Sequence, residues 1–244
     1  MIKQFINEHE VFQTNPNFNI KIVNLETKFD KVKVIIVDDF YKNPDLVREL
    51  ALLIPPTCNE RITSDLPAGK NSGRINAFYL LDSLGPVYDK IIKETFPEVV
   101  NPEFEKTGCN DQIISSFTRA TFMVNVMTSE NLPPRVPHID NPDFRAFAST
   151  IYLNTEEECA GGTAFYALDD KIISEFNHNF LDTHGTIKPT KFVIEDEGDW
   201  KKIHLVEMKY NRMILYQQNI FHSAYIHDKM FTNNTYRLNQ QFFI

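Results

Sequence analysis

The hydrophobic and polar positions divide the chain into a first part with helical periodicity and a second part rich in short strands. In the first part, Lys33–Phe40 is a β-branched run that ends in two aspartates, which predicts a buried strand. Apolar positions from Leu46 to Ile54 follow Pro44 at helical spacing and predict an amphipathic helix, and Val87–Phe96 predicts a second helix. We expect the rest of this part to hold edge strands in 1–30, a loop over 55–75 and a strand over 75–81.

The second part, from Asp111 onward, is expected to form the core of a β-rich domain. Ile113–Met127 alternates polar and apolar residues, and further strands are predicted over 147–154, 163–167, 192–194, 204–210, 213–216 and 236–244. The polar stretch 169–199 predicts an insertion with a short helix over 171–176. Many short strands after helices indicate a mainly β fold with flanking helices, a sandwich or jelly roll. We therefore expect one domain, 1–244, in which 1–110 supports a core formed by 111–244.

Charge and cysteine content narrow the classes of protein. The 25 basic and 33 acidic residues give 25 − 33 = −8, which lacks the positive footprint of a duplex nucleic-acid binder. Cys58, Cys109 and Cys159 are odd in number and far apart, which argues for a reducing compartment and against a disulfide framework or a cysteine zinc site. No apolar stretch approaches the roughly 18 residues of a membrane span, and no secretory signal is evident. We expect a cytoplasmic protein with no membrane partner, and the sequence does not indicate its oligomeric state.

The first candidate for chemistry is the pair His138 and Asp140, which are two residues apart. Side chains alternate along a strand, so residues at this spacing point the same way and can reach one metal ion. Imidazole and carboxylate together suit a divalent ion such as Fe(II). The motif also occurs by chance, and its alternative is a loop histidine paired with an aspartate.

His222 is the best candidate for a third metal ligand. It follows the predicted strand over 213–216 after a short turn, an arrangement that can bring a side chain across the mouth of a barrel. The other histidines have less suitable surroundings, in the polar insertion, within a strand or in a surface loop; they are His178, His184, His204 and His227.

The last predicted strand carries an unusual polar face. Arg237, Asn239 and Gln241 share one side of this strand by period two. An arginine provides a permanently charged fork that binds a carboxylate through two hydrogen bonds. The face fits a polar pocket, and its alternative is an edge strand whose arginine is solvated.

Taken together, these motifs resemble the Fe(II)- and 2-oxoglutarate-dependent oxygenase superfamily, and within it the prolyl-4-hydroxylase-like branch and its small bacterial and phage members. The family order is an HxD motif, a hairpin similar to YLN…GGxTxF, a distal histidine and a basic residue on the next strand. Here it reads His138-Ile-Asp140, Ser149-Thr-Ile-Tyr-Leu-Asn154, Gly161-Gly-Thr-Ala-Phe165, His222 and Arg237. The resemblance covers residues 118–244.

The resemblance implies a double-stranded β-helix and a dioxygenase. His138, Asp140 and His222 would bind Fe(II), and 2-oxoglutarate would chelate the metal while its C5 carboxylate pairs with Arg237. Dioxygen would be the co-substrate, and decarboxylation of 2-oxoglutarate to succinate would accompany hydroxylation of a C–H bond. The implied substrate is a peptidyl residue, with proline the first candidate, or a free amino acid. The loops over 55–75 and 169–203 are candidate substrate lids.

Some features depart from the family pattern. His222 and Arg237 are 15 positions apart, a longer interval than is usual, so we expect residues 223–235 to bulge. The segment before the HxD motif lacks the tyrosine that often contacts 2-oxoglutarate. Tyr152 or Tyr216 could serve instead, with a purely structural aromatic role as the alternative. DNA-repair members carry a second arginine after the first on the same strand, where this chain has Asn239 and Gln241, so nucleobase demethylation is not favoured.

Two other functions compete with the oxygenase. A cupin-like protein could use the same three ligands to hold Zn(II) or Ni(II) without redox chemistry. A non-catalytic interaction protein could retain a decayed site, although the intact set of ligands argues against this. Arg135 and Arg145 flank the HxD motif and would either bind an acidic substrate or be solvated.

Overall fold

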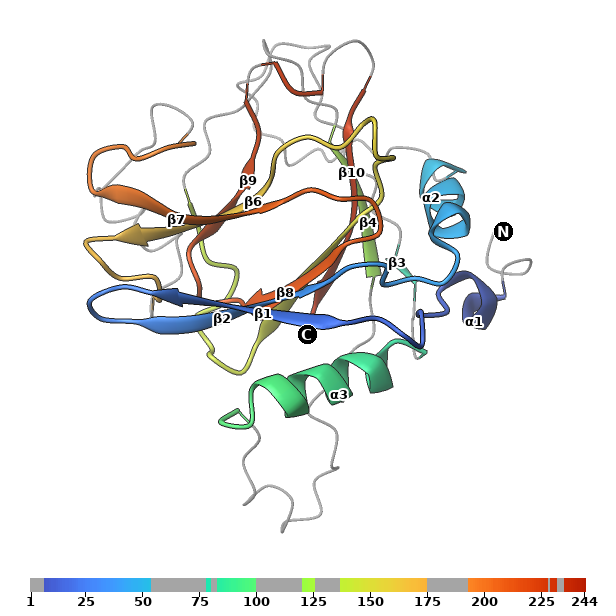
Figure 1. The fold of residues 1–244 in the computed structure, drawn as a ribbon, viewed down its shortest axis with the longest axis horizontal. Helices are drawn as coiled ribbons and strands as arrows, with labels where there is room; N and C mark the ends of the chain where they lie inside the picture. The colour runs from blue at the N-terminus through green and yellow to red at the C-terminus, as the bar shows by residue number, and fades with distance from the viewer. Residues whose placement is uncertain are drawn as a thin grey trace.

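The protein is mostly β, with two antiparallel sheets and few helices (Figure 1). The computed structural model describes residues 7–53, 78–79, 83–99, 120–125, 137–174, 193–227, 229–231 and 235–244. Its helices are α1 (Glu8–Val11), α2 (Pro44–Leu53) and α3 (Gly85–Thr95). Its strands are β1 (Ile20–Glu26), β2 (Lys31–Val37), β3 (Phe78–Tyr79), β4 (Ala120–Asn125), β5 (Phe147–Tyr152), β6 (Gly162–Leu168), β7 (Trp200–Glu207), β8 (Met213–Gln217), β9 (His222–Tyr225) and β10 (Arg237–Phe243).

The chain passes repeatedly between the two sheets. The larger sheet has the order β1-β2-β8-β5-β10-β4-β3 and the smaller one β7-β6-β9. The chain therefore runs from β5 in the larger sheet through β6 and β7 in the smaller, then to β8, β9 and β10 in alternate sheets. Strand β2 joins the larger sheet by pairing with β8, Ile35 opposite Leu215. The first 110 residues thus extend the sheet with strands of their own as well as supporting it.

The central strands of the larger sheet, β2, β8, β5 and β10, are buried on both faces. Phe147, Met213 and Leu238 on one face pack in a single cluster with Tyr88 and Ile92 of α3, and α3 lies below the β1–β2 hairpin in Figure 1. On the other face a second cluster joins this sheet to the smaller one through the side chains of Tyr152, Ile214, Tyr216, Phe165 and Ala167. The space between the two sheets is where the candidate site residues meet.

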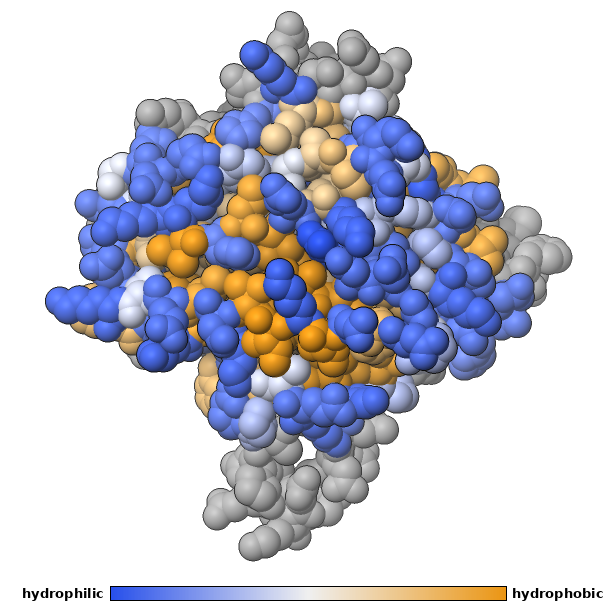
Figure 2. Space-filling view, viewed as in Figure 1, coloured by the Kyte–Doolittle hydropathy of each residue, from blue (hydrophilic) through white to orange (hydrophobic). Residues whose placement is uncertain are grey.

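One side of the molecule leaves the edges of both sheets open. A groove of about 580 Å³ lies there between β1, β2 and β7, and Lys21, Ile36, His204 and Arg212 are among its lining residues. Figure 2 shows hydrophobic surface in the middle of this view, bordered by hydrophilic side chains. The acidic and basic groups of the groove are mixed, and Arg212 is paired with Asp38 at 2.6 Å. None of the candidate metal ligands lines this groove.

Several predictions from the sequence are confirmed. The β-rich character is correct, and the predicted helices correspond to α2 and α3. The strands predicted over 147–154, 163–167, 204–210, 213–216 and 236–244 correspond to β5, β6, β7, β8 and β10 with shifted ends. Of the strand predicted over 75–81, the structure describes β3. The loop over 55–75 lies outside the described residues. Among the helices of the described segments, none is long and apolar enough to cross a membrane.

Other predictions from the sequence are wrong or incomplete. The helix over 171–176 is absent from its described part, because Lys171 pairs with Leu168 in an antiparallel bridge and the backbone continues without helical turns. Val193 is not in a strand; its carbonyl and that of the next residue accept hydrogen bonds from the hydroxyl of Tyr166 at 3.2 and 3.1 Å. Strand β9 was expected to be a loop. It forms because it pairs with β6, a tertiary contact that local sequence does not reveal.

Candidate metal centre

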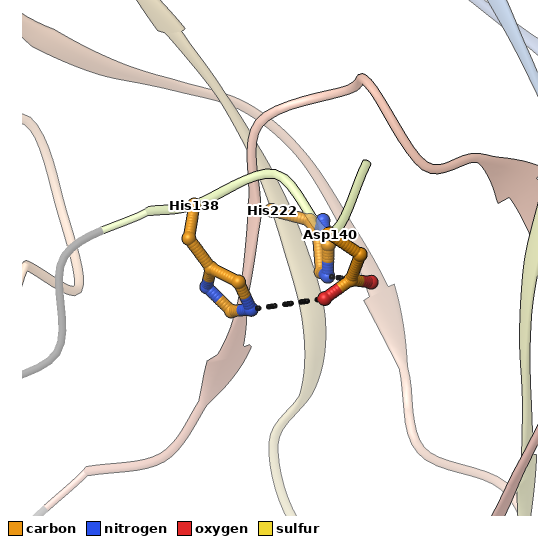
Figure 3. Close-up of side chains that lie close together, drawn as sticks. All are labelled: His138, Asp140 and His222. Atoms are coloured by element: carbon orange, nitrogen blue, oxygen red, sulfur yellow. Dashed lines mark ion pairs between the residues drawn. The ribbon is translucent and has the colours of Figure 1, made fainter. Parts of the chain in front are cut away.

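The three predicted metal ligands come together at the start of β9. His138 and His222 face each other in an antiparallel bridge, and each backbone N–H donates to the carbonyl of the other at 2.9 Å. Asp140 lies two residues further on, and its backbone N–H donates to the carbonyl of Gln218 at 2.9 Å. Backbone hydrogen bonds therefore fix the main chain of all three residues before any metal binds. Figure 3 shows the three side chains converging.

The distances between these side chains suit one bound cation. Oδ1 of Asp140 lies 3.6 Å from Nε2 of His138, and Oδ2 of Asp140 lies 3.4 Å from Nε2 of His222 (Figure 3). One potential ligand atom from each residue lies within 4.8 Å of the other two. The side chains are 39%, 17% and 5% exposed for His138, Asp140 and His222. The site is therefore closed beside His222 and opens toward His138.

The hydrogen bonds around His222 indicate that its free nitrogen is an acceptor. Nδ1 lies 2.9 Å from the carbonyl oxygen of Ile220, which can only accept, so we place the hydrogen on Nδ1. Nε2 then carries a lone pair and faces the Asp140 carboxylate. Oδ2 of Asp140 is buried and has no hydrogen-bond donor among the described residues. The Nε2 lone pair of His222 and Oδ2 of Asp140 thus face each other, an arrangement that a divalent cation between them would satisfy.

The charge on Asp140 also fits a metal ligand. Burial of this carboxyl raises its pKa, but positive charge on the neighbouring imidazoles of His222 and His138, whenever they are protonated, outweighs that effect and holds the pKa below the ordinary value of 3.8. The carboxylate is therefore ionised at neutral pH. Two histidines and one carboxylate are a ligand set that suits a divalent metal such as Fe(II) and leaves other coordination positions open.

Arg237 is a buried cation on a central strand, not on a solvated edge. Its strand, β10, lies between β5 and β4, and its side chain reaches across to the smaller sheet. Nη1 donates to the carbonyl of Gly162 at 2.7 Å, and Nη2 lies 3.5 Å from the hydroxyl of Thr163. Burial lowers the pKa of the guanidinium. Among the described residues no carboxylate pairs with Arg237, and its Nε–H has no acceptor.

The other predicted cofactor-binding residues line the same inter-sheet space. The Tyr152 hydroxyl lies 2.7 Å from that of Thr163, and the Arg237 guanidinium lies over the Tyr152 ring at 5.4 Å. Tyr216 is buried, and its ring is 4.8 Å from that of His222. Asn239 is 3% exposed, and its buried Oδ1 has no partner in the described part of the chain. Unsatisfied polar groups therefore extend from the metal centre toward Arg237.

The remaining sequence candidates lie elsewhere. His204 is on β7, and burial together with the nearby Lys21 lowers its pKa. His227 contacts the Tyr225 hydroxyl at 2.6 Å, and Arg145 is paired with Asp143 at 2.8 Å on the surface. The other candidates named above, His178, His184 and Arg135, lie outside the described residues.

Sequence reasoning missed two residues that shape the site. Thr163 links Tyr152 to Arg237, and the carbonyl of Ile220 orients His222. Thr163 could have been found from its spacing, because it lies two residues before the inward-facing Phe165 and so shares its face. The Ile220 carbonyl belongs to the backbone, and no residue type identifies such a contact.

Comparison with known proteins assigns the chain to a family but not to a function. Residues 83–239 match the model of DUF6445, a family of unknown function. The chain belongs to this family. The matched range spans the metal-ligand cluster and Arg237. No curated protein matches the sequence.

Proposed function

We propose that this protein is an Fe(II)- and 2-oxoglutarate-dependent dioxygenase that hydroxylates a C–H bond. His138, Asp140 and His222 would hold the iron, and Arg237 would hold the far carboxylate of 2-oxoglutarate. The proposal keeps the cytoplasmic location expected from the cysteine content. It requires the metal and the cosubstrate to share one pocket between the two sheets.

The observation that carries the proposal is a buried arginine without a carboxylate in the same inter-sheet space as the histidine–aspartate cluster. A buried guanidinium needs compensation, because removing a charge from water costs several kcal/mol. Arg237 has two neutral acceptors but no carboxylate among the described residues. A bound dicarboxylate would supply the missing charge at one end and reach the metal at the other.

The order of strands supports a jelly roll of the double-stranded β-helix type. Strands β5 to β10 pass between sheets in the alternation that such a roll requires, and β4, β10, β5 and β8 are neighbours in one sheet. In the other sheet, β7, β6 and β9 are followed by the bridge from His222 to His138. A fourth strand beside β9 would complete two four-stranded layers.

The residues of the chain have distinct tasks in the proposed reaction. When bound, iron and 2-oxoglutarate would supply the oxidising chemistry together with dioxygen, one oxygen atom of which would go to succinate and the other to the substrate, with release of carbon dioxide. Arg237 orients the cosubstrate by a charge-assisted contact to its C5 carboxylate. The hydroxyls of Tyr152 and Thr163 lie beside the guanidinium and hydrogen-bond to each other. That bond uses one of the two hydroxyl hydrogens, and the other can donate to the same carboxylate. The buried aromatic walls exclude water from the path between the two ends.

Tyr216 and Asn239 complete the proposed cosubstrate pocket. Tyr216 lies beside His222, so its hydroxyl is a candidate donor to an oxygen of the cosubstrate near the metal. Asn239 stands two residues from Arg237 on the same strand face, and its amide oxygen has no partner in the described part of the chain. By resemblance, the substrate is a peptidyl residue, with proline the first candidate, or a free amino acid.

The test is anaerobic addition of Fe(II) with and without 2-oxoglutarate, followed by visible absorption. Chelation of Fe(II) by the keto acid is expected to produce a weak charge-transfer band that needs both components. His222→Ala should abolish the band by removing the most buried ligand, while His204→Ala, which changes a histidine outside the cluster, should retain it. Metal binding without any response to 2-oxoglutarate would refute the oxygenase and favour a non-redox, cupin-like metal protein.

A further inference from the structure

On the inner face of the larger sheet, side chains of neighbouring strands form rows across the sheet. These rows follow one another from Arg237 to the metal centre. The strand register places Asn239 beside Tyr152, Gln241 beside Thr150, and Phe243 beside Ala148. Ala148 in turn lies beside Tyr216, whose ring is 4.8 Å from that of His222. Phe242 and Ile244 pack with the cluster on the helix side, so Phe243 projects from the inner face. Phe243, Ala148 and Tyr216 therefore form the row at the level of the metal.

Burial along β10 decreases steadily toward this row. Arg237 and Asn239 are 4% and 3% exposed, Gln241 is half-buried, and Phe243 is 48% exposed. The metal ligands show the same direction of opening, from His222 at 5% to His138 at 39%. The pocket is thus closed at its arginine end and opens to solvent where Phe243 lies.

We propose that Phe243 forms the floor of the substrate entrance and selects an uncharged, apolar or aromatic group for the metal centre. This inference rests on the proposed function. Neighbouring strands are about 4.8 Å apart, so Phe243 is about 10 Å from Tyr216 across Ala148. A substrate whose ring packs on Phe243 would place another part of its side chain or its backbone near the metal.

The charges around the entrance support an uncharged occupant. In the described part of the inner face, the side chains of Gln241, Thr150, Phe243 and Ala148 do not ionise, and Tyr216 completes their rows beside the metal ligands. Beyond those ligands, the nearest charged pair along the chain, Asp143 and Arg145, is neutralised by two hydrogen bonds of 3.0 and 2.8 Å. A charged substrate group would lose hydration there without gaining a partner. Gln241 offers one amide, which suits the backbone of an amino acid or peptide.

The experiment is saturation-transfer NMR with N-acetylphenylalaninamide as the probe, on metal-free and Mn(II)-loaded protein. We expect binding to the wild type, about fivefold weaker binding to Phe243→Ala, and near-normal binding to Phe243→Leu, which retains an apolar side chain. N-acetyllysinamide and N-acetylaspartic acid amide should bind more weakly than the neutral probe. Phe29→Ala is the matched control, because Phe29 is 57% exposed in the turn between β1 and β2, away from the site.

Bound Mn(II) locates the probe and separates this inference from the oxygenase proposal. Paramagnetic relaxation of the probe protons in the Mn(II) protein, lost in His222→Ala, would place the probe at the entrance. Equal affinities for Phe243→Ala and Phe29→Ala, or equal binding of charged and neutral amides, would overturn the role of Phe243. Binding through Phe243 by a protein that takes up no metal would support the apolar surface and overturn the oxygenase.

Discussion

Replacing Arg237 with methionine should remove 2-oxoglutarate binding while changing the stability of the fold little. Methionine keeps the unbranched stem that crosses between the sheets but removes the charge. Arg237 is 4% exposed, and its described contacts are two neutral oxygens and an aromatic ring. The consequences for folding and for binding can therefore be worked out separately.

Two opposing effects set the change in folding free energy. Removing an uncompensated buried charge is favourable, because its desolvation costs several kcal/mol. Losing the hydrogen bonds to Gly162 and Thr163 is unfavourable, by about 1.5–3 kcal/mol for a well-formed charged bond and less for the long contact of 3.5 Å. The sum should lie within about 2 kcal/mol of zero. An arginine with a buried carboxylate partner would instead cost about 3–5 kcal/mol.

The change in binding should be much larger. A carboxylate held by two charge-assisted hydrogen bonds loses about 3–6 kcal/mol when the guanidinium is removed, which weakens 2-oxoglutarate between about 100-fold and about 10,000-fold. Urea unfolding would give the first quantity, and calorimetric titration with 2-oxoglutarate in the presence of Mn(II) the second. Metal affinity without the cosubstrate should not change, since Arg237 contacts no metal ligand.

Arg212→Met is the matched control. Arg212 is paired with Asp38 and donates to the carbonyl of Glu207, so its loss should lower stability and leave 2-oxoglutarate affinity unchanged. The reasoning would be refuted if Arg237→Met lowered the free energy of unfolding by more than about 3 kcal/mol while the folded protein still bound 2-oxoglutarate normally. That outcome would make Arg237 a structural residue whose counter-charge lies within the chain.

Three further predictions concern the metal, the turn before β6 and acid stability. His222→Ala should lose most of its affinity for Co(II), measured by visible absorption, while His204→Ala retains it. Gly161→Ala should cost well over the roughly 1 kcal/mol that a left-handed non-glycine residue costs by itself, because its Cβ would lie 2.0 Å from a backbone oxygen of β9. Gly198→Ala, with φ +60 and open space around it, should cost only about that 1 kcal/mol in urea unfolding, and equal losses would contradict the steric account. Asp38 has a pKa below 3.8 because a neighbouring guanidinium hydrogen-bonds to it, so its contribution to stability is present above the unfolded pKa and is lost as pH falls through the folded one. Asp38→Asn should therefore reduce the free energy of unfolding at pH 7 and make it fall less between neutral pH and pH 3. An unchanged fall toward low pH would contradict this.

Much of the candidate site could be predicted because its residues follow short-range rules. His138 and Asp140 share a face through the two-residue repeat of an extended chain, and the same repeat aligns Arg237 with Asn239. The strand rule also explains why β5, β6, β8 and β10 were placed nearly correctly. These predictions need only the local pattern of side chains.

The features that were missed depend on contacts between distant segments. Strand β9 has only four residues and exists because β6 lies beside it, so the local sequence from His222 onward resembles a loop. The turn at 168–171 is set by its own bridge and by the Asp30 carboxylate, which accepts hydrogen bonds from the next two backbone amides. Likewise, the sequence pattern could not distinguish a solvated Arg237 from a buried one. That distinction depends on which strands flank β10.

The strongest argument for a ligand comes from the two ends of the inter-sheet space considered together. Among the residues that the structure describes, each end leaves a polar group unsatisfied: an aspartate oxygen without a donor at the metal cluster, and an arginine Nε–H without an acceptor at the other end. A fold that needed only stability would fill this space with apolar side chains, because unsatisfied buried groups cost about 1–3 kcal/mol each and charged ones more. The two deficits have opposite sign, one calling for a cation and the other for an anion. A metal ion chelated by a small dicarboxylic keto acid satisfies both with one bound complex, which neither a metal alone nor an anion alone can do.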